Sequence, residues 1–141
     1  MTRRPARAIP EAPAPRDRAG LAAELFGLAA GPAAWIAQLT IDYGLSSYAC
    51  FPGDAPAPGA QPAWERPALL AVNLICLALA LGGLAVSLAN RRRLGDAQGR
   101  AAGRGRFLAL CGVLASAGFA IAIAFNAVSA VALRTCWRIP S

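Results

Sequence analysis

Three long apolar stretches separated by arginine-rich segments constrain this chain more than any other feature. Charged residues are absent from Leu69 to Ala89 and from Phe107 to Leu133, and the stretch from Ala19 to Ala49 contains only Glu24 and Asp42. A helix of about 20 apolar residues crosses a hydrocarbon core of roughly 30 Å, and each stretch reaches that length. The sequence therefore predicts an all-α membrane bundle of three transmembrane helices, at residues 19–49, 68–90 and 107–133.

The first stretch is longer than one span requires, and Gly31-Pro32 interrupts it. Proline in a helix interior removes a backbone hydrogen bond and bends the helix. We expect residues 20–30 to be tilted or partly interfacial, with a kink at Pro32.

The segments outside the apolar stretches are short. Residues 1–18 are rich in Pro, Ala and Arg without apolar periodicity, which predicts a disordered cytoplasmic tail. The apolar run starts too late and is too long for a cleavable secretory signal, so we expect an uncleaved anchor. We expect residues 19–136 to form one transmembrane domain, the proline-rich segment 51–67 to be an outer loop, and residues 137–141 to be a short outer tail.

The distribution of basic residues predicts the orientation. All fourteen are arginines; five precede the first span and six lie between the second and third. Only Arg66, Arg134 and Arg138 remain for the other side. Because cytoplasmic flanks retain excess basic residues, the N-terminus is predicted inside and the C-terminus outside, in a multi-pass protein of the bacterial inner membrane.

Arg91, Arg92 and Arg93 directly follow the second apolar stretch and are predicted to determine topology and contact anionic lipid. We expect an interfacial ion pair between this cluster and Glu24. The net charge of +7 also raises the question of nucleic-acid binding. No aromatic or helical nucleic-acid module accompanies the arginines, so nucleic acid is not a predicted partner.

Small and polar residues recur three and four positions apart, which places them on one face of each predicted helix. In the first span this stripe is Glu24, Gly27, Gly31, Ala34, Gln38, Asp42 and Ser46. In the second it is Asn73, Cys76, Ala80, Gly83, Ser87 and Asn90. In the third it is Cys111, Ala115, Gly118, Ala122, Asn126 and Ser129. Transmembrane helices associate through close packing of small residues and polar hydrogen bonds, so these stripes are the predicted bundle interior.

Asp42, Asn73 and Asn126 all lie about 9 to 12 Å below the predicted outer boundary, with Gln38 one turn deeper. We therefore predict an intramembrane polar layer of these four residues. An ionisable residue at such a depth is a functional candidate, so Asp42 has two interpretations. It either binds a proton or cation, or it joins helices by hydrogen bonding.

The four cysteines divide according to the predicted topology. Cys50 ends the first span and Cys136 follows the third, so both lie at the outer side, where a disulfide between them suits an oxidising periplasm. Metal binding, thiol exchange and unpaired thiols remain alternatives. Cys76 and Cys111 lie within spans and are predicted to be small packing residues.

The residue types that enzymes and cofactor sites usually require are scarce. The chain has no His, no Lys and no Cys-x-x-Cys, and its one Met is Met1. Haem and transition-metal sites draw mainly on His, Met and closely spaced Cys, and a phosphate-binding loop of the Walker type needs Lys. We therefore predict a protein without catalytic activity, cofactor or metal.

Two segments carry a resemblance to a known family. They are Gly31-Pro32-Ala33-Ala34-Trp35 with Gln38, Tyr43 and Cys50-Phe51-Pro52, and Gly105-Arg106-Phe107-Leu108 with Ser116, Phe119, Asn126 and Cys136. The chain resembles, over most of residues 20–136, small uncharacterised proteobacterial three-helix membrane proteins encoded beside cytochrome c oxidase subunits and their assembly factors. The resemblance implies an association with respiratory-chain assembly or regulation, and it supplies no catalytic residue.

The predicted function is that of an accessory or assembly component of a respiratory, terminal-oxidase membrane complex. Its expected partners are membrane lipids and other membrane proteins or a second copy of the chain. Two alternatives remain open. One is an oligomeric proton or small-solute pathway that uses Asp42, and the other is thiol-disulfide exchange at Cys50 and Cys136.

Overall fold

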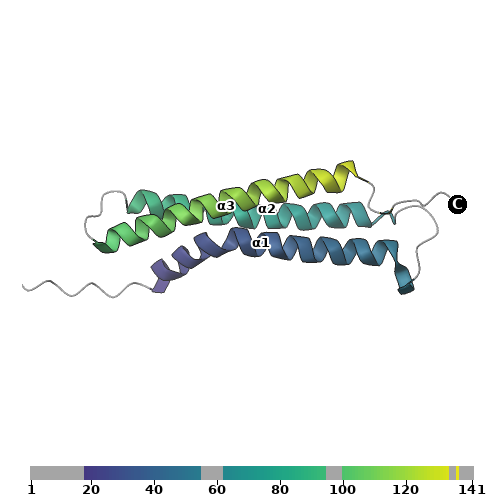
Figure 1. Ribbon diagram of the computed structural model, residues 1–141, viewed down its shortest axis with the longest axis horizontal. Coiled ribbons are helices and arrows are strands. Elements are labelled where there is room, and N and C mark those ends of the chain that lie inside the picture. The colour runs from purple at the N-terminus through teal and green to yellow at the C-terminus, as the bar shows by residue number, and fades with distance from the viewer. Residues whose placement is uncertain (1–17, 55–61, 95–99, 134–135, 137–141) are drawn as a thin grey trace, which may run out of the picture.

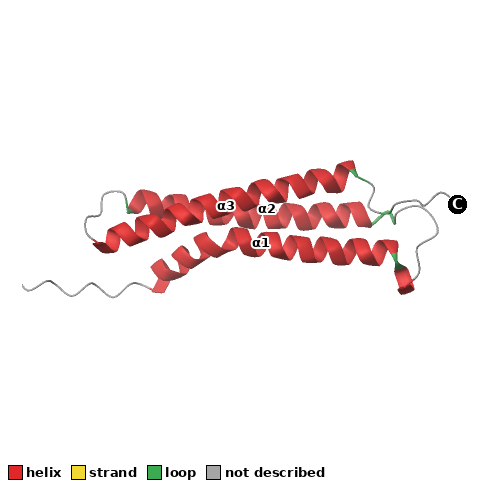
Figure 2. Cartoon of the chain, viewed as in Figure 1, coloured by secondary structure: helices red, strands yellow, loops and turns green. Residues whose placement is uncertain are grey.

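A computed structural model describes residues 18–54, 62–94, 100–133 and 136. Within these ranges the chain forms helices α1 (Arg18–Cys50), α2 (Glu65–Arg93) and α3 (Arg100–Ala132), and one short 3-10 turn, η1 (Pro52–Asp54) (Figures 1 and 2). Each of the three helices is long and apolar enough to cross a membrane. The prediction of an all-α, three-span bundle is confirmed, and the protein is a multi-pass membrane protein.

The predicted tails, residues 1–18 and 137–141, lie outside the described residues, except that α1 begins at Arg18. The predicted spans 19–49 and 68–90 lie wholly inside α1 and α2, and 107–133 overlaps α3 to its end at Ala132. The helices continue past the apolar stretches because apolarity marks the part inside lipid, whereas backbone hydrogen bonding continues into the interface.

Prolines account for two of the helix ends. Phe51 precedes Pro52, and a residue before proline is disfavoured in helical conformation, so α1 ends at Cys50. Gly53 follows with a positive φ of 67°, which glycine adopts without steric cost. Pro67 lies in the first turn of α2, where a missing backbone N–H is tolerated.

Pro32 lies in the interior of α1, and the helix continues through it. Figure 1 shows a bend in α1 between its purple and blue parts. Proline has no N–H to donate to the carbonyl four residues earlier, and its ring presses against that carbonyl. The bend agrees with the kink expected at Pro32.

The three helices lie side by side in an up-down-up arrangement, with α2 antiparallel to α1 and α3 (Figure 1). Every pair of helices is in contact. The chain order therefore puts the end of α1, the start of α2 and the end of α3 at one end of the bundle. The start of α1, the end of α2 and the start of α3 share the opposite end, which carries the arginine cluster.

The buried faces of α1 and α2 contain the predicted stripes. On α1, Gly27, Gly31, Ala34 and Gln38 are buried, and Asp42 is half-buried. On α2 the buried stripe includes Asn73, Cys76, Ala80, Gly83 and Ser87. These small residues let the backbones approach closely, which is the main source of helix association in lipid.

The predicted interior face of α3 is wrong by about one residue position. Gly118 and Ser129 are exposed, and Cys111, Ala115, Ala122 and Asn126 are only half-buried. The buried residues of α3 are Gly105, Ala109, Gly112, Ser116, Ala120 and Ile123. Small residues occupy two neighbouring faces of this helix, so their spacing alone does not identify the packed one.

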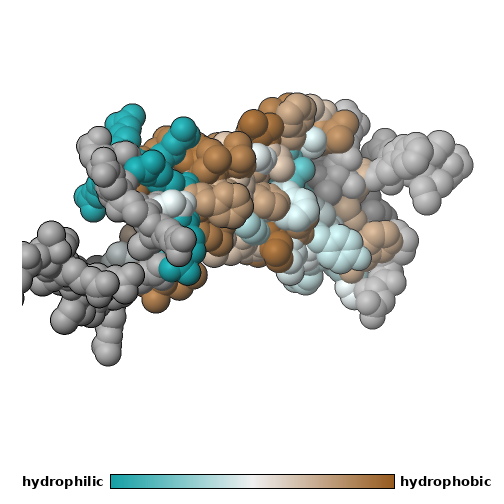
Figure 3. All heavy atoms as spheres, turned by 60° about the vertical axis from the view of Figure 1, so that its left-hand side comes forward, coloured by the Kyte–Doolittle hydropathy of each residue, from teal (hydrophilic) through white to brown (hydrophobic). Residues whose placement is uncertain are grey.

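The outward surface is that of a protein in lipid. Large apolar side chains are exposed along all three helices, among them Ile36, Leu74, Leu114 and Phe125. Figure 3 shows hydrophobic side chains over the middle of the bundle and hydrophilic ones gathered towards one end. In water such a surface would favour aggregation, whereas in hydrocarbon it is the favoured arrangement.

Candidate functional site

Asn73 of α2 is at the centre of the polar layer and is 1% exposed. Its Nδ2 donates to Asp42 Oδ2 at 2.8 Å and to the carbonyl of Leu69 at 2.8 Å. Its Oδ1 accepts a hydrogen bond from Gln38 Nε2. One amide therefore bonds to two side chains of α1 and to its own helix, so both of its polar atoms are satisfied away from water.

Gln38 extends this network to the third helix. Its Oε1 accepts a long hydrogen bond of 3.4 Å from Asn126 Nδ2, and Gln38 itself is fully buried. The donors run in one direction, from Asn126 on α3 to Gln38 on α1, then to Asn73 on α2. Asn73 in turn donates to Asp42 on α1. The structure thus brings together Asp42, Asn73 and Asn126, which the sequence places at similar depth, and Gln38, which it places one turn deeper.

Asp42 is the one acid of this layer, and its two oxygens differ. Oδ2 accepts the bond from Asn73, whereas Oδ1 is buried and has no hydrogen-bond partner among the described residues. A charged carboxylate at the centre of a bilayer costs about 2.5–3.5 kcal/mol on insertion scales. Among the described residues, Oδ1 is the one buried side-chain nitrogen or oxygen of the layer without a hydrogen-bond partner.

A second set of contacts surrounds glycines on all three helices. Ser116 Oγ of α3 donates to the carbonyl of Gly27 at 3.0 Å. A Cβ placed on Gly31 would lie 2.8 Å from Ser116 Cα, and one on Gly112 would lie 2.5 Å from Ser87 Oγ. Only glycine fits where helix backbones approach this closely, so this glycine–serine contact is a point of tight packing among the helices.

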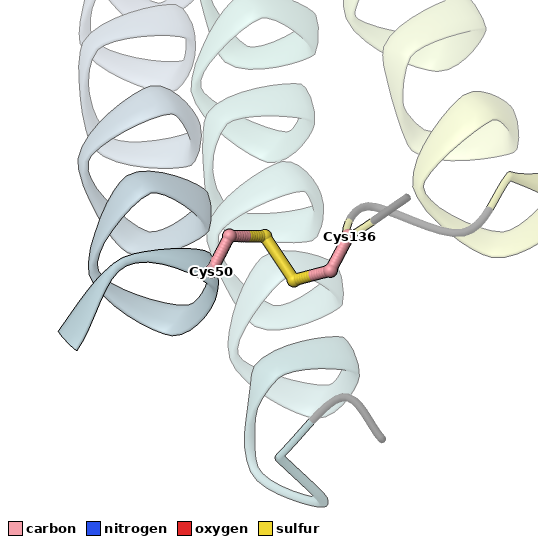
Figure 4. Close-up of a disulfide and its surroundings, with 2 residues drawn as sticks. All are labelled: Cys50 and Cys136. Carbon is pink, nitrogen blue, oxygen red and sulfur yellow. A yellow bond between two sulfur atoms is a disulfide. The ribbon is translucent and has the colours of Figure 1, made fainter. Parts of the chain in front are cut away.

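A disulfide joins Cys50, the last residue of α1, to Cys136, beyond the end of α3 (Figure 4). The two Cα atoms are 5.5 Å apart, and 86 positions separate the residues in sequence. The predicted pairing is confirmed. Cys76 is a buried free thiol and Cys111 a half-buried one. Among the described residues, no group of three or more His, Cys, Asp or Glu could hold a metal ion.

Sequence reasoning missed Glu65. It is fully buried in the first turn of α2, and neither carboxylate oxygen has a hydrogen-bond partner among the described residues. Because residues 51–67 read as a proline-rich loop, Glu65 was not expected to lie in a helix. The available signal was an acid two residues before a proline, since acids and prolines both favour the first turn of a helix.

At the opposite end of the bundle, Arg91, Arg92 and Arg93 form the last turn of α2, and all three are exposed. The expected ion pair with Glu24 is absent within the ranges that the structure describes. Glu24 lies beside α3 instead, since a Cβ on Gly105 would be 4.0 Å from Glu24 Oε1. Arg106 of α3 donates from Nε to the carbonyl of Leu94 at 2.9 Å, which connects α3 to the end of α2.

The chain matches no protein-family model, no curated protein and no solved structure. The resemblance to oxidase-associated membrane proteins stays a prediction.

Proposed function

We propose that this small membrane protein has no catalytic activity and acts as an accessory or assembly component of a respiratory, terminal-oxidase complex in the bacterial inner membrane. Its N-terminus lies inside and its C-terminus outside. It binds other membrane proteins or a second copy of itself through its lipid-facing surface, and it also contacts membrane lipids.

One observation carries this proposal. The four side chains of the polar layer, on all three helices, form one chain of hydrogen bonds: Asn126 donates to Gln38, Gln38 to Asn73 and Asn73 to Asp42. Hydrogen bonds of this kind hold transmembrane helices together. Because these polar side chains bond to one another inside the bundle, a partner would bind the outward, lipid-facing surface.

Two further features support the location and the partner class. Eleven of the fourteen arginines precede the first span or lie between the second and third, which favours those segments on the cytoplasmic side. The disulfide between Cys50 and Cys136 suits an oxidising compartment at the other side. The respiratory association rests on the resemblance of residues 20–136 to proteins encoded beside oxidase genes.

Affinity purification of the tagged protein from native membranes in mild detergent tests the proposal. We expect the eluate to contain haem absorbance and oxygen-consuming activity above that of an identically tagged, unrelated three-span protein. We also expect deletion of the gene to lower the amount of fully assembled oxidase on native gels. Recovery of the protein alone, as a monomer, together with normal oxidase levels in the deletion strain would contradict the proposal.

A second candidate is an oligomeric proton or small-solute pathway, and the unpartnered Asp42 Oδ1 favours it. Asp42→Asn separates the two because the amide retains hydrogen bonding but does not titrate. In proteoliposomes, a pathway predicts proton flux in the wild type that Asp42→Asn abolishes. The accessory role predicts no flux in either protein and unchanged association with the oxidase.

The third candidate, thiol-disulfide exchange, starts from the same Cys50–Cys136 disulfide. An exchange enzyme forms a mixed disulfide with its substrate, and removal of the resolving cysteine traps that species. Cys136→Ser and Cys50→Ser would then each be screened for adducts on non-reducing gels. The accessory role predicts no adduct with either variant.

A further inference from the structure

The arginine-bearing end of the bundle contains a hollow between α2 and α3 of about 300 Å³. Its lining residues are Arg91 of α2 and Arg106, Phe107 and Leu110 of α3. An arginine from each of two helices therefore lines one space, and none of the four lining residues is an acid. Of the three consecutive arginines at the end of α2, only Arg91 lines this hollow.

The position of Arg106 is set by its neighbours. Its Nε donates to the carbonyl of Leu94, at the end of α2, over 2.9 Å. The Arg106 side chain is exposed, and this bond ties its guanidinium to the end of α2 across the gap between the two helices. Because guanidinium groups recognise phosphate through several N–H donors in a fixed plane, a hollow with two of them favours a phosphate-bearing ligand.

The other two lining residues, Phe107 and Leu110, are apolar, and exposed apolar side chains follow them along α3 towards the middle of the bundle. Phe107 is 66% exposed, Leu110 lies one turn further along α3, and Leu114 follows on the same face at 65% exposed. Charged groups thus lie at the end of the helices, and a strip of apolar side chains leads away from them into the span. This order of polarity is that of a phospholipid, with its headgroup at the interface and its acyl chain in the hydrocarbon.

We propose that this hollow binds an anionic phospholipid, with Arg91 and Arg106 on the headgroup phosphate and Phe107 and Leu110 on the first part of an acyl chain. Free phosphate shares the headgroup chemistry but has nothing to place on the apolar strip. The site goes beyond general attraction of a basic segment to the membrane, because it requires Arg91 and not its neighbours in sequence.

The test uses the purified full-length protein in neutral detergent, titrated with phosphatidylglycerol and followed by native mass spectrometry. The variant is Arg91→Gln, and the matched control is Arg92→Gln, which removes the same charge from the same exposed turn. Since one arginine near a membrane surface contributes about a five-fold change in affinity for anionic lipid, we expect Arg91→Gln to weaken binding about five-fold. We expect Arg92→Gln to change it less than two-fold.

Three further measurements decide whether the ligand is an anionic lipid or a free phosphate compound. Phosphatidylcholine is expected to bind at least five-fold more weakly, and millimolar inorganic phosphate or glycerol 3-phosphate is expected not to displace phosphatidylglycerol. Equal losses in the two arginine variants would overturn the proposal, as would equal binding of the two lipids. Displacement by inorganic phosphate would also contradict the proposal, because it would show that the hollow binds a free anion and not a lipid. Both variants alter exposed residues, so retention of helical circular dichroism is the expected control for folding.

Discussion

At the scale of single residues, the polar layer depends on Asn73. Its side chain contacts both Gln38 and Asp42 on the neighbouring helix, and Gln38 is fully buried. Loss of one partner in such a pair leaves the other polar group unsatisfied away from water. In membranes this cost is moderated because the unfolded, inserted helices also find partners, so measured interhelical bonds average about 0.6 kcal/mol and reach about 1.7 kcal/mol.

We predict that Gln38 and Asn73 are energetically coupled by about 0.6–1.7 kcal/mol. The measurement is a double-mutant cycle with Gln38→Leu and Asn73→Leu, with the free energy of unfolding determined by titration with a denaturing detergent. The control cycle pairs Gln38→Leu with Ser87→Ala, because Ser87 is buried on the same helix as Asn73 but far along it. The control should be additive within about 0.5 kcal/mol, and additivity in the first cycle would show that the bond contributes nothing.

At the scale of the helices, the closest approach is at glycines rather than at large side chains. A Cβ on Gly31 would lie 2.8 Å from the Cα of Ser116, a backbone atom that moves only if the whole helix moves. Gly118 of α3 is a natural comparison, because a Cβ there would meet no atom within 4 Å. The same substitution thus tests packing at one site and intrinsic helix preference at the other.

We predict that Gly31→Ala lowers the free energy of unfolding by about 1–3 kcal/mol, the usual cost of overpacking. Gly118→Ala should leave it unchanged or raise it slightly, since alanine is the better helix former. Unfolding in denaturing detergent, followed by circular dichroism, measures both. Equal effects of the two substitutions would contradict the tight contact between α1 and α3.

The helices also show which features can be read from sequence. Apolar length is sufficient to predict three spans, because burial of about 20 apolar residues in lipid outweighs other preferences. The interior faces of α1 and α2 follow from residues such as Gln38 and Asn73, which are too polar to face lipid. On α3 the same argument chose the face of Gly118 instead of Ser116, because glycine, alanine and serine tolerate both lipid and packed surroundings. The burial of Glu65 was not predicted, because it depends on how the helix ends meet in three dimensions and not on a local sequence pattern.

At the scale of the whole molecule, a disulfide cross-links the bundle at one of its two ends. The disulfide connects α1 to the residue Cys136 beyond α3, over a separation of 86 positions. In a soluble chain, closing a loop of this size stabilises the fold by about 4.6 kcal/mol through the entropy of the unfolded state. Here the unfolded chain keeps its spans inserted, so its ends are already restricted and the gain is smaller.

We predict that Cys50→Ser lowers the free energy of unfolding by less than about 4.6 kcal/mol and leaves the helical content unchanged. On non-reducing gels, the wild type, Cys76→Ala and Cys111→Ala should all shift in mobility when reduced, whereas Cys50→Ser should not. A mobility shift that disappears in Cys76→Ala or Cys111→Ala would show that a different pair is bonded.

The position of the disulfide also has a consequence for the order of events during biosynthesis. One of its cysteines ends α1 and the other follows α3, so the bond forms only after Cys136 has been synthesised and α3 has entered the membrane. Until then the Cys50 thiol lacks its partner and is accessible to oxidants and other thiols. The disulfide therefore marks chains in which α3 has been inserted, whereas a chain that stops short of α3 keeps Cys50 without this partner.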